Sequence, residues 1–181
     1  QLGTDKCITD TKELTIYKTD KSYEPGILPK CVIIAEDDND IKTVLSYANK
    51  HKTSLTVRGA GSGKSGGAIP EVDGIVLSLE KYNKILELDL SNSCITVQPG
   101  VITDTIKEIA SKEGLFYPPD PSSSDWCTIG GNVAENSGSS NALKYGVTGD
   151  YVLGLEGFFA NGEPFKLGGK LYKDVAGYDL K

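Results

Sequence analysis

The first part of the chain has the hydrophobic pattern of strands that alternate with a helix. Cys31–Ala35 and Ile75–Leu79 are continuous apolar runs, which are typical of strands buried on both faces. Between them, apolar residues recur at helical spacing from Ile41 onward, after an acidic turn that begins at Asp37. Ser54–Arg58 alternates like a further strand. This order predicts a small lobe whose sheet is at least partly parallel.

The second part of the chain predicts two hairpins and a helix. Ile85–Leu88 and Cys94–Val97 are short apolar strands joined by a turn-rich segment. Thr103–Lys112 carries the apolar stripe of a helix, and a glycine follows shortly after it. Val152–Ala160 and Glu163–Leu167 flank an Asn-Gly pair, the strongest short hairpin signal. We therefore expect an α+β fold with a mainly antiparallel second lobe that starts near residue 84.

The composition is that of an ordinary globular domain, and it argues against several classes of function. Hydrophobic residues make up 38% of the chain and charged residues 24%. The net charge is −6 and there is no basic run, so neither a nucleic acid nor an anionic membrane surface is an expected partner. A bound phosphate would instead contact backbone amides. No apolar run approaches the roughly 20 residues of a membrane helix, and a cytoplasmic location without a transmembrane segment is expected.

Cysteine and histidine usage predicts no metal site. The four cysteines show no C-x-x-C spacing and the chain contains a single histidine. The cysteines are expected to be free thiols. The chain begins at Gln1 and contains no methionine, which favours a fragment of a longer protein.

The glycine-rich loop Gly59–Gly67 carries the first candidate chemistry. Its Gly-Lys-Ser sequence looks like the end of a Walker A motif, but Arg58 occupies the position where that motif requires glycine. Gly61, Gly63 and Gly66 match the spacing of the dinucleotide fingerprint. Both motifs must lead into a helix, whereas a predicted strand follows here. Two interpretations remain open: a nest of backbone N–H groups for a pyrophosphate, or a flexible surface loop.

The segment Pro118–Tyr151 carries the second candidate chemistry. It is rich in glycine, proline and asparagine and poor in aliphatic residues, and long segments of this kind in a compact domain are usually functional. Pro118–Pro121 predicts an extended approach, Thr128–Asn132 a tight turn, and Val133–Asn136 the start of a helical turn. We interpret the segment as a loop-helix-loop wall around an extended cofactor that contains phosphate.

Five stretches, taken in order, resemble the PCMH-type FAD-binding domain of the vanillyl-alcohol oxidase superfamily. They are VRGAGSGKSGGA (57–68), PPDPSS (118–123), TIGGNVAEN (128–136), LKYGVTGDYVLGLE (143–156) and KDVAGYDL (173–180). Within that superfamily the sequence is most similar to the glycolate oxidase FAD subunit and to the D-lactate and D-2-hydroxyglutarate dehydrogenases. The resemblance extends over nearly the whole chain, from about Leu2 to Leu180.

The resemblance implies two α+β lobes with FAD between them. The first lobe would comprise residues 1–83 with the pyrophosphate loop, and the second residues 84–181, truncated at its C-terminal end. The first loop would wrap the pyrophosphate, and the second segment would line the flavin and the ribityl chain. The implied cofactor-binding residues are Arg58, Gly59, Ala60, Gly61, Ser62, Gly63, Ser65, Pro119, Asp120, Ser123, Thr128, Gly130, Gly131, Asn136, Gly138, Tyr145 and Gly146.

The resemblance also implies that FAD is bound non-covalently. Some relatives attach the flavin through a histidine in the first loop, and the matching position here is Ser62. Cys127 lies near the position where another relative forms a thioether, but it is offset by about one residue. We expect Cys127 to be an ordinary packed thiol.

The implied function is that of an FAD-linked 2-hydroxy-acid dehydrogenase or oxidase of the glycolate or D-lactate type, whose flavin accepts a hydride from a small 2-hydroxy acid. Substrate would be bound through a cap domain that these residues lack, so no catalytic or metal-binding residue is expected. Partner subunits of a glycolate oxidase-type complex are a further implication. The alternatives are a flavin-binding module without turnover and a nucleotide hydrolase.

Two positions depart from the family pattern. Gly149 stands where an arginine is usual before Asp150, and Gly157 lies within a predicted strand where a β-branched residue is expected. A glycine inside a strand weakens it or marks a close approach of another group.

Overall fold

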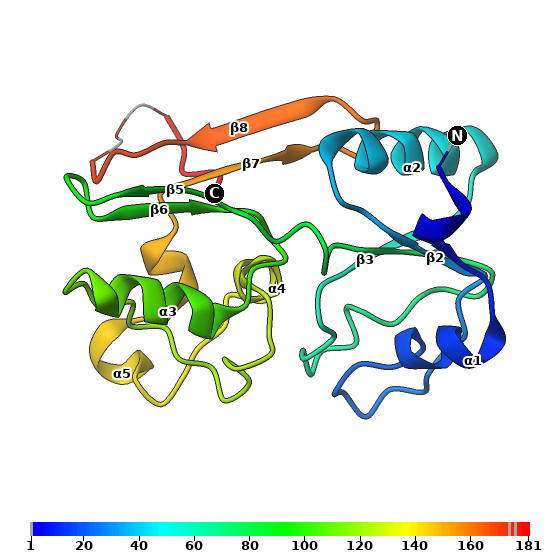
Figure 1. The fold of residues 1–181 in the computed structure, drawn as a ribbon, viewed down its shortest axis with the longest axis horizontal. Helices are drawn as coiled ribbons and strands as arrows, with labels where there is room; N and C mark the ends of the chain where they lie inside the picture. Colours follow the sequence, from blue (N-terminus) through cyan, green and yellow to red (C-terminus); the bar gives the residue numbers. More distant parts are fainter. Residues whose placement is uncertain (1, 174, 176) are drawn as a thin grey trace.

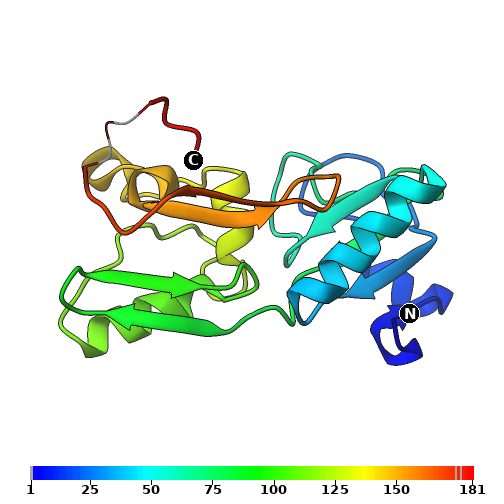
Figure 2. The ribbon, with the colours of Figure 1, turned by 90° about the horizontal axis from the view of Figure 1, so that it is seen from above.

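The computed structural model describes residues 2–173, 175 and 177–181, and the chain folds as an α+β protein (Figure 1). Asp174 and Ala176, which belong to the 173–180 stretch quoted above, lie outside the described residues. The elements of the first 80 residues gather at one end of the molecule, and most later elements lie at the other end (Figures 1 and 2).

The sheet near the N-terminus has four strands in the order β1 (Cys7–Ile8), β2 (Cys31–Ile34), β4 (Ile75–Ser78) and β3 (Leu55–Arg58). Strands β2 and β3 both run parallel to β4, whereas β1 is antiparallel to β2. The prediction of a partly parallel sheet is confirmed. The glycine loop leaves the carboxyl end of β3, which is where parallel sheets commonly bind ligands.

Helices cover both faces of this sheet. The long helix α2 (Asp38–His51) lies on one face, and the carboxylate of Asp37 caps its first turn as the acidic pattern predicted. The other face is covered by α1 (Thr11–Leu14) and the 3-10 turn η2 (Thr15–Tyr17), and another 3-10 turn, η1 (Thr4–Lys6), precedes β1.

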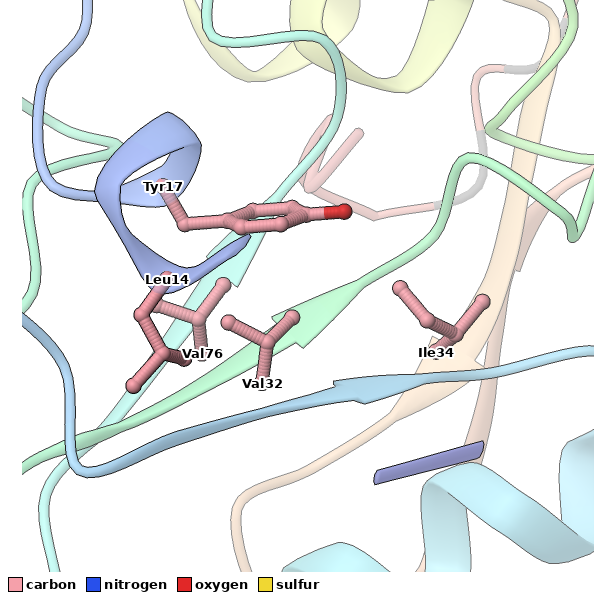
Figure 3. Close-up of a cluster of buried hydrophobic side chains, with 5 residues drawn as sticks. All are labelled: Leu14, Tyr17, Val32, Ile34 and Val76. Atoms are coloured by element: carbon pink, nitrogen blue, oxygen red, sulfur yellow. The ribbon is translucent and has the colours of Figure 1, made fainter. Parts of the chain in front are cut away.

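The core consists of two layers, one on each face of the sheet. On the α1 side, Leu14 and Tyr17 pack against Val32, Ile34 and Val76, whose side chains point toward them (Figure 3). On the α2 side lies a second cluster of buried residues, made of Ile33, Ala35, Val44, Ile75 and Leu77. Successive side chains of β2 and β4 point to opposite faces, so both faces need apolar residues. This explains the continuous apolar runs of these strands.

An ion pair holds the N-terminal segment to the start of α2. Asp40 is 4% exposed, and its Oδ2 accepts hydrogen bonds from Lys6 Nζ at 2.6 Å and from the N–H of Glu36 at 3.0 Å. Burial alone would raise the pKa of Asp40, but the hydrogen bond from Lys6 and the other donors outweigh it and lower the pKa below its ordinary value of 3.8.

Asp40→Asn is expected to reduce the free energy of unfolding at pH 7 by about 2 kcal/mol, because Lys6 and Glu36 lose a charged acceptor. The folded-state pKa of Asp40 is depressed, so its contribution is fully present above the unfolded-state value and is lost as the pH falls through the folded-state value. Urea unfolding at pH 7 and pH 2.5 checks this: the difference between wild type and variant should shrink at the lower pH. The exposed Asp125→Asn is the matched control, and an equal effect of the two substitutions would contradict the assignment.

The second part of the chain contains two antiparallel hairpins and a helix. β5 (Ile85–Asp89) pairs with β6 (Cys94–Val97), and β7 (Gly154–Phe158) pairs with β8 (Pro164–Gly168). Helix α3 (Thr103–Lys112) has the predicted ends. The mainly antiparallel character of this part is confirmed, with strand ends that differ from the prediction by up to two residues.

Three short helical elements complete this part of the fold: α4 (Ile129–Ala134), α5 (Ala142–Tyr145) and the 3-10 turn η3 (Thr148–Tyr151). Together with α3 they lie beneath the two hairpins in the view of Figure 1. Among the described residues, none of the helices is both long and apolar enough to span a bilayer.

The β7–β8 hairpin reaches across to α2, as Figure 1 shows. Asn49 Nδ2 donates a hydrogen bond to the carbonyl of Ala160, and Lys42 Nζ lies 5.1 Å from the ring centre of Phe158. The predicted hairpin is confirmed, and Gly162 adopts a φ of +87° in its turn.

Gly157 lies in β7 directly opposite Phe165 of β8. A Cβ built on Gly157 would lie 2.8 Å from the Phe165 ring. The strand glycine therefore marks a close approach: the ring of the neighbouring strand covers the space that a β-branched residue would need.

Candidate functional site

A cavity of about 350 Å³ lies where the two parts of the chain meet. One wall is the loop that follows β3, from Gly59 to Ala68, and the other is formed by parts of the 121–138 segment, including α4. Figure 1 shows α4 next to this loop. The two segments that the sequence singled out therefore face each other across one cavity.

The glycine loop presents a row of backbone donors. All residues from Gly59 to Lys64 line the cavity, and within the described part of the chain none of their N–H groups donates a hydrogen bond to a protein acceptor. Gly61 adopts a φ of +75°, which glycine reaches without strain. Consecutive free amides in a turn of this kind form an anion-binding nest. No helix follows the loop, so it does not form a Walker A or a Rossmann site.

Arg58 supports this loop from outside the cavity. Its side chain is 6% exposed, and Nη1 donates hydrogen bonds to the carbonyls of Thr19 at 2.9 Å and Ala68 at 3.3 Å. Nη2 donates to the carbonyl of Ile16 at 3.4 Å, and the guanidinium lies 5.6 Å from the ring centre of Tyr17. Arg58 is not among the residues that line the cavity. Burial lowers the pKa of Arg58 from its ordinary value, and the guanidinium stays charged.

Close packing around the cavity requires glycine at two positions. A Cβ on Gly59 would fall well inside van der Waals contact with Thr128 Oγ1, and one on Gly130 would lie 2.5 Å from Pro99 Cβ. Gly130 also donates its N–H to the carbonyl of Pro99 at 2.8 Å. Gly59 therefore serves the contact between the walls, and Gly130 serves the packing of α4.

The sequence places the helical turn of the second wall too late. The prediction starts it at 133–136, whereas α4 spans Ile129–Ala134. Glycines disfavour a helix, so local propensity argues against a helical 129–131. The tertiary contact of Gly130 with Pro99 overrides that preference, because only a residue without a side chain fits there.

A buried polar network attaches α4 to α3. Asn132 Nδ2 donates to Thr103 Oγ1 at 2.6 Å, and Thr103 Oγ1 lies 3.3 Å from Cys127 Sγ. All three side chains are at most 3% exposed, and Asn132 also lines the cavity. Cys127 is a free thiol packed in this network. Sequence reasoning missed Asn132, because its side chain reaches the cavity only when residues 129–134 are helical.

The predicted cofactor residues fall into two groups. Those that line the cavity are Gly59, Ala60, Gly61, Ser62, Gly63, Ser123, Thr128, Gly131 and Gly138. Those that do not line it are Arg58, Ser65, Pro119, Asp120, Gly130, Asn136, Tyr145 and Gly146.

Most members of the second group make contacts that shape the second wall. Pro119 is buried, and Asp120 Oδ1 accepts a hydrogen bond from Lys107 Nζ at 2.5 Å. The carbonyl of Tyr145 accepts one from the hydroxyl of Tyr151 at 2.6 Å.

Asn136 explains the unusual glycine at position 149. Its φ is +48°, and its Oδ1 accepts the N–H of Gly149 at 2.8 Å. A Cβ on Gly149 would lie 2.9 Å from the same oxygen. Gly146 is a second such position: its φ is +86°, and a Cβ built on it would fall well inside van der Waals contact with the carboxylate of Asp150. Position 149 therefore has no room for a larger side chain while this hydrogen bond is kept.

Three charged residues of the cavity were missed by sequence reasoning: Asp20, Lys64 and Glu135. Asp20 lies outside both motifs, and Glu135 lies inside a motif whose glycines drew attention first. The described residues contain no group of three or more His, Cys, Asp or Glu side chains arranged to hold a metal ion.

Comparisons with known proteins identify the fold and the family of this chain. A family described as "FAD binding domain" matches residues 29–168. The chain is 49% identical over 166 residues to glycolate oxidase subunit GlcD of Bacillus subtilis, a match that covers 91% of this chain and 35% of that protein. It is 39% identical over 152 residues to a D-lactate dehydrogenase of Anaerostipes hadrus, covering 84% and 32% respectively. The chain thus spans about a third of the length of these relatives.

Solved structures share the fold at low sequence identity. An alkyldihydroxyacetonephosphate synthase matches with a TM-score of 0.83 and 19% identity, over 97% of this chain and 34% of that one. A substrate-bound p-cresol methylhydroxylase matches with a TM-score of 0.79 and 20% identity, over 99% and 37%. The fold is therefore of the PCMH type. On the strength of the family match over most of its length, this chain belongs to the FAD binding domain family, and its cofactor is FAD.

Proposed function

We propose that this chain is the FAD-binding part of an FAD-linked 2-hydroxy-acid dehydrogenase or oxidase of the glycolate or D-lactate type. The observation that carries the proposal is the row of amides from Gly59 to Lys64 that face the cavity without a protein acceptor. The reaction class is supported by the relatives of this chain that are named glycolate oxidase subunit GlcD and D-lactate dehydrogenase.

The residues present fit the cofactor. The amides of 59–64 would hold the pyrophosphate without a basic patch, in keeping with the net charge of −6. The predicted cofactor residues that line the cavity would contact FAD directly, and Arg58, Ser65, Pro119, Asp120, Gly130, Asn136, Tyr145 and Gly146 would shape the groove or extend the contact. We place the two lobes at residues 1–83 and 84–181, with FAD between them.

When bound, FAD supplies a two-electron acceptor for a hydride from the substrate. The task of this chain is to hold and orient the cofactor. His51, the single histidine of the sequence, lies in α2 with its ring 4.4 Å from that of Tyr47, and it is not among the cavity-lining residues. We therefore assign substrate binding and proton abstraction to a cap domain outside these 181 residues, and we assign no catalytic residue to this chain. Partner subunits of a glycolate oxidase-type complex and a cytoplasmic location complete the proposal.

Flavin binding followed by turnover tests the proposal. The 181-residue chain should quench FAD fluorescence on binding, and dithionite should reduce the bound flavin. The full-length protein should in addition reduce an artificial dye when glycolate or D-lactate is added. Preference for magnesium-ATP over FAD, or a full-length protein that binds FAD but oxidises no 2-hydroxy acid, would refute it.

A flavin-binding module without turnover is the second candidate for the chain on its own. It is favoured by the position of the single histidine on α2, outside the set of cavity-lining residues. Bound flavin that dithionite reduces but 2-hydroxy acids do not, in the 181-residue chain alone, is the result expected for this module.

Acid denaturation is expected to release intact FAD. Ser62 stands at the loop position from which a histidine would bond to the flavin. The side chain of Cys127 is only 1% exposed and packs beside Thr103. After precipitation with trichloroacetic acid, the flavin absorbance should be found in the supernatant. Yellow colour that stays with the washed pellet would contradict non-covalent binding.

A further inference from the structure

We propose that Cys7 and Cys31 form a redox-active dithiol site. A low-molecular-weight disulfide oxidises the two thiols to an intramolecular disulfide, which fastens the N-terminal segment to the sheet. The site lies in a second cavity, and among the described residues none that lines this cavity also lines the one at the glycine loop. The inference therefore does not depend on the FAD site.

The second cavity has a volume of about 380 Å³ and lies where the N-terminal residues and β2 meet α2. Its walls include Leu2, Ile33 and Val44, and both Cys7 and Cys31 line it. The two cysteines are free thiols and only partly buried, so a small reagent in the cavity can reach them. A charged reagent would lose hydration between apolar walls, whereas a small uncharged disulfide would not.

The register of the sheet brings the two cysteines together on one face. β1 is antiparallel to β2, with Cys7 directly opposite Ile33. Cys31 lies two residues before Ile33 on β2, and side chains two apart on a strand point to the same face. Cys7 and Cys31 are therefore diagonal neighbours, and both pack against the buried cluster on the α2 side of the sheet.

The thiol groups of the two residues also contact each other. Burial raises the pKa of the Cys31 thiol to about 11, and the charge of Cys7 and a hydrogen bond with its side chain add to the rise. Because the thiolate is the nucleophile, a thiol with a raised pKa attacks slowly at neutral pH. We therefore assign the first attack to Cys7 and the second to Cys31.

The reaction consists of two successive thiol–disulfide exchanges. Cys7 gives its proton to solvent, and its sulfur attacks one sulfur of the reagent. The S–S bond of the reagent breaks, and the other half leaves as a thiolate that takes up a proton. Cys31 then loses its proton, attacks the Cys7 sulfur and displaces the second half of the reagent in the same way. The protein loses two electrons and two protons, and the reagent gains them as it becomes two thiols.

Formation of the disulfide needs a small movement of β1. Diagonal neighbours on paired strands have Cα atoms about 7–8 Å apart, and disulfides usually span about 4.4–6.8 Å. β1 is two residues long and lies at the edge of the sheet, close to the N-terminus. Short segments in such positions move at low cost, so β1 can move toward Cys31 without disturbing β2 and β4.

The loop that this disulfide closes contains the segment that holds Arg58. It runs from residue 7 to residue 31, and it includes Ile16 and Thr19, whose carbonyls accept hydrogen bonds from the Arg58 guanidinium. A disulfide restricts such a loop in the unfolded chain and thereby stabilises the folded one. Oxidation should raise the urea midpoint of unfolding by about 1 M, after the cost of moving β1.

Peptide mapping of the folded 181-residue chain after treatment with hydroxyethyl disulfide tests the inference. Remaining thiols are blocked with iodoacetamide before digestion. Trypsin cleaves after lysine and so leaves the two cysteines in separate peptides, 7–12 and 31–42. Mass spectrometry without reductant should find these two peptides joined, and dithiothreitol should separate them. The same treatment in urea should give several pairings, because the fold then no longer selects one.

Two variants show whether both thiols are needed. In Cys31→Ser the reaction should stop at a mixed disulfide on Cys7, and the reagent should leave the urea midpoint unchanged. Cys94→Ser is the matched control: Cys94 is also partly buried but lies in β6, so this variant should form the 7–31 disulfide as the wild type does.

The peptide map of the wild type decides the matter even if Cys31→Ser does not fold. After treatment of the folded chain, thiols that are still free at both Cys7 and Cys31, or a pairing of either with another cysteine, would overturn the inference. A 7–31 disulfide that leaves the urea midpoint unchanged or lowers it would overturn it as well, since the bond would then not fasten the N-terminal segment.

Discussion

Replacing Gly59 with alanine is expected to lower the affinity for FAD by about tenfold or more. The added Cβ would fall well inside van der Waals contact with Thr128 Oγ1 and 3.3 Å from Thr128 Cβ. Thr128 is only 3% exposed, so its side chain has little space to turn away. The glycine loop and the start of α4 must then move apart, and the two walls of the cavity separate. Flavin fluorescence titrations measure the effect.

Two further variants show whether this contact is the cause. Gly169→Ala is the matched control, because a Cβ there meets nothing within 4 Å, and its FAD affinity should equal that of the wild type. Adding Thr128→Ala to Gly59→Ala removes the oxygen that clashes and should restore part of the lost affinity, relative to Thr128→Ala alone. Equal affinities of Gly59→Ala and wild type would show that the walls do not need this close approach.

Replacing Arg58 with methionine is expected to reduce the free energy of unfolding by about 3 kcal/mol. Methionine fills a similar volume but leaves the carbonyls of Thr19, Ala68 and Ile16 without their charged donor. It also removes the cation that lies over the ring of Tyr17. Urea unfolding of the FAD-free chain measures the loss.

Arg58→Lys should fall between the wild type and Arg58→Met, because an ammonium group cannot reach carbonyls on both sides as a planar guanidinium does. Lys112→Met at an exposed site on α3 is the matched control and should change stability by less than about 0.5 kcal/mol. An effect of Arg58→Met as small as that of the control would contradict a supporting role for the guanidinium.

The elements that could be predicted from the sequence are those whose local pattern and tertiary role agree. Helix α3 and strand β6 have the predicted ends, and β2 and β4 show continuous apolar runs because both of their faces are covered. The sequence also predicted that a strand, and not a helix, follows the glycine loop, and β4 is the next element along the chain.

The parts that could not be predicted depend on contacts between distant residues. α1 is four residues long, and its place in the core follows from the packing of Leu14 on the sheet. α4 begins at a glycine-rich stretch because Gly130 fits against Pro99. Asp20 and Glu135 meet the same cavity from positions that are far apart in the chain, and no local pattern connects them.

The support of Arg58 bears on where an FAD-binding unit of this family can be cut. The family match starts at residue 29, which suggests a minimal unit that begins there. Two of the three carbonyls that hold the Arg58 guanidinium belong to Ile16 and Thr19, and so do not lie in that unit. A domain trimmed to the matched region would keep every glycine of the loop and yet lose the segment that holds it in shape. The smallest autonomous unit therefore extends toward the N-terminus beyond the part of the sequence by which the family is identified.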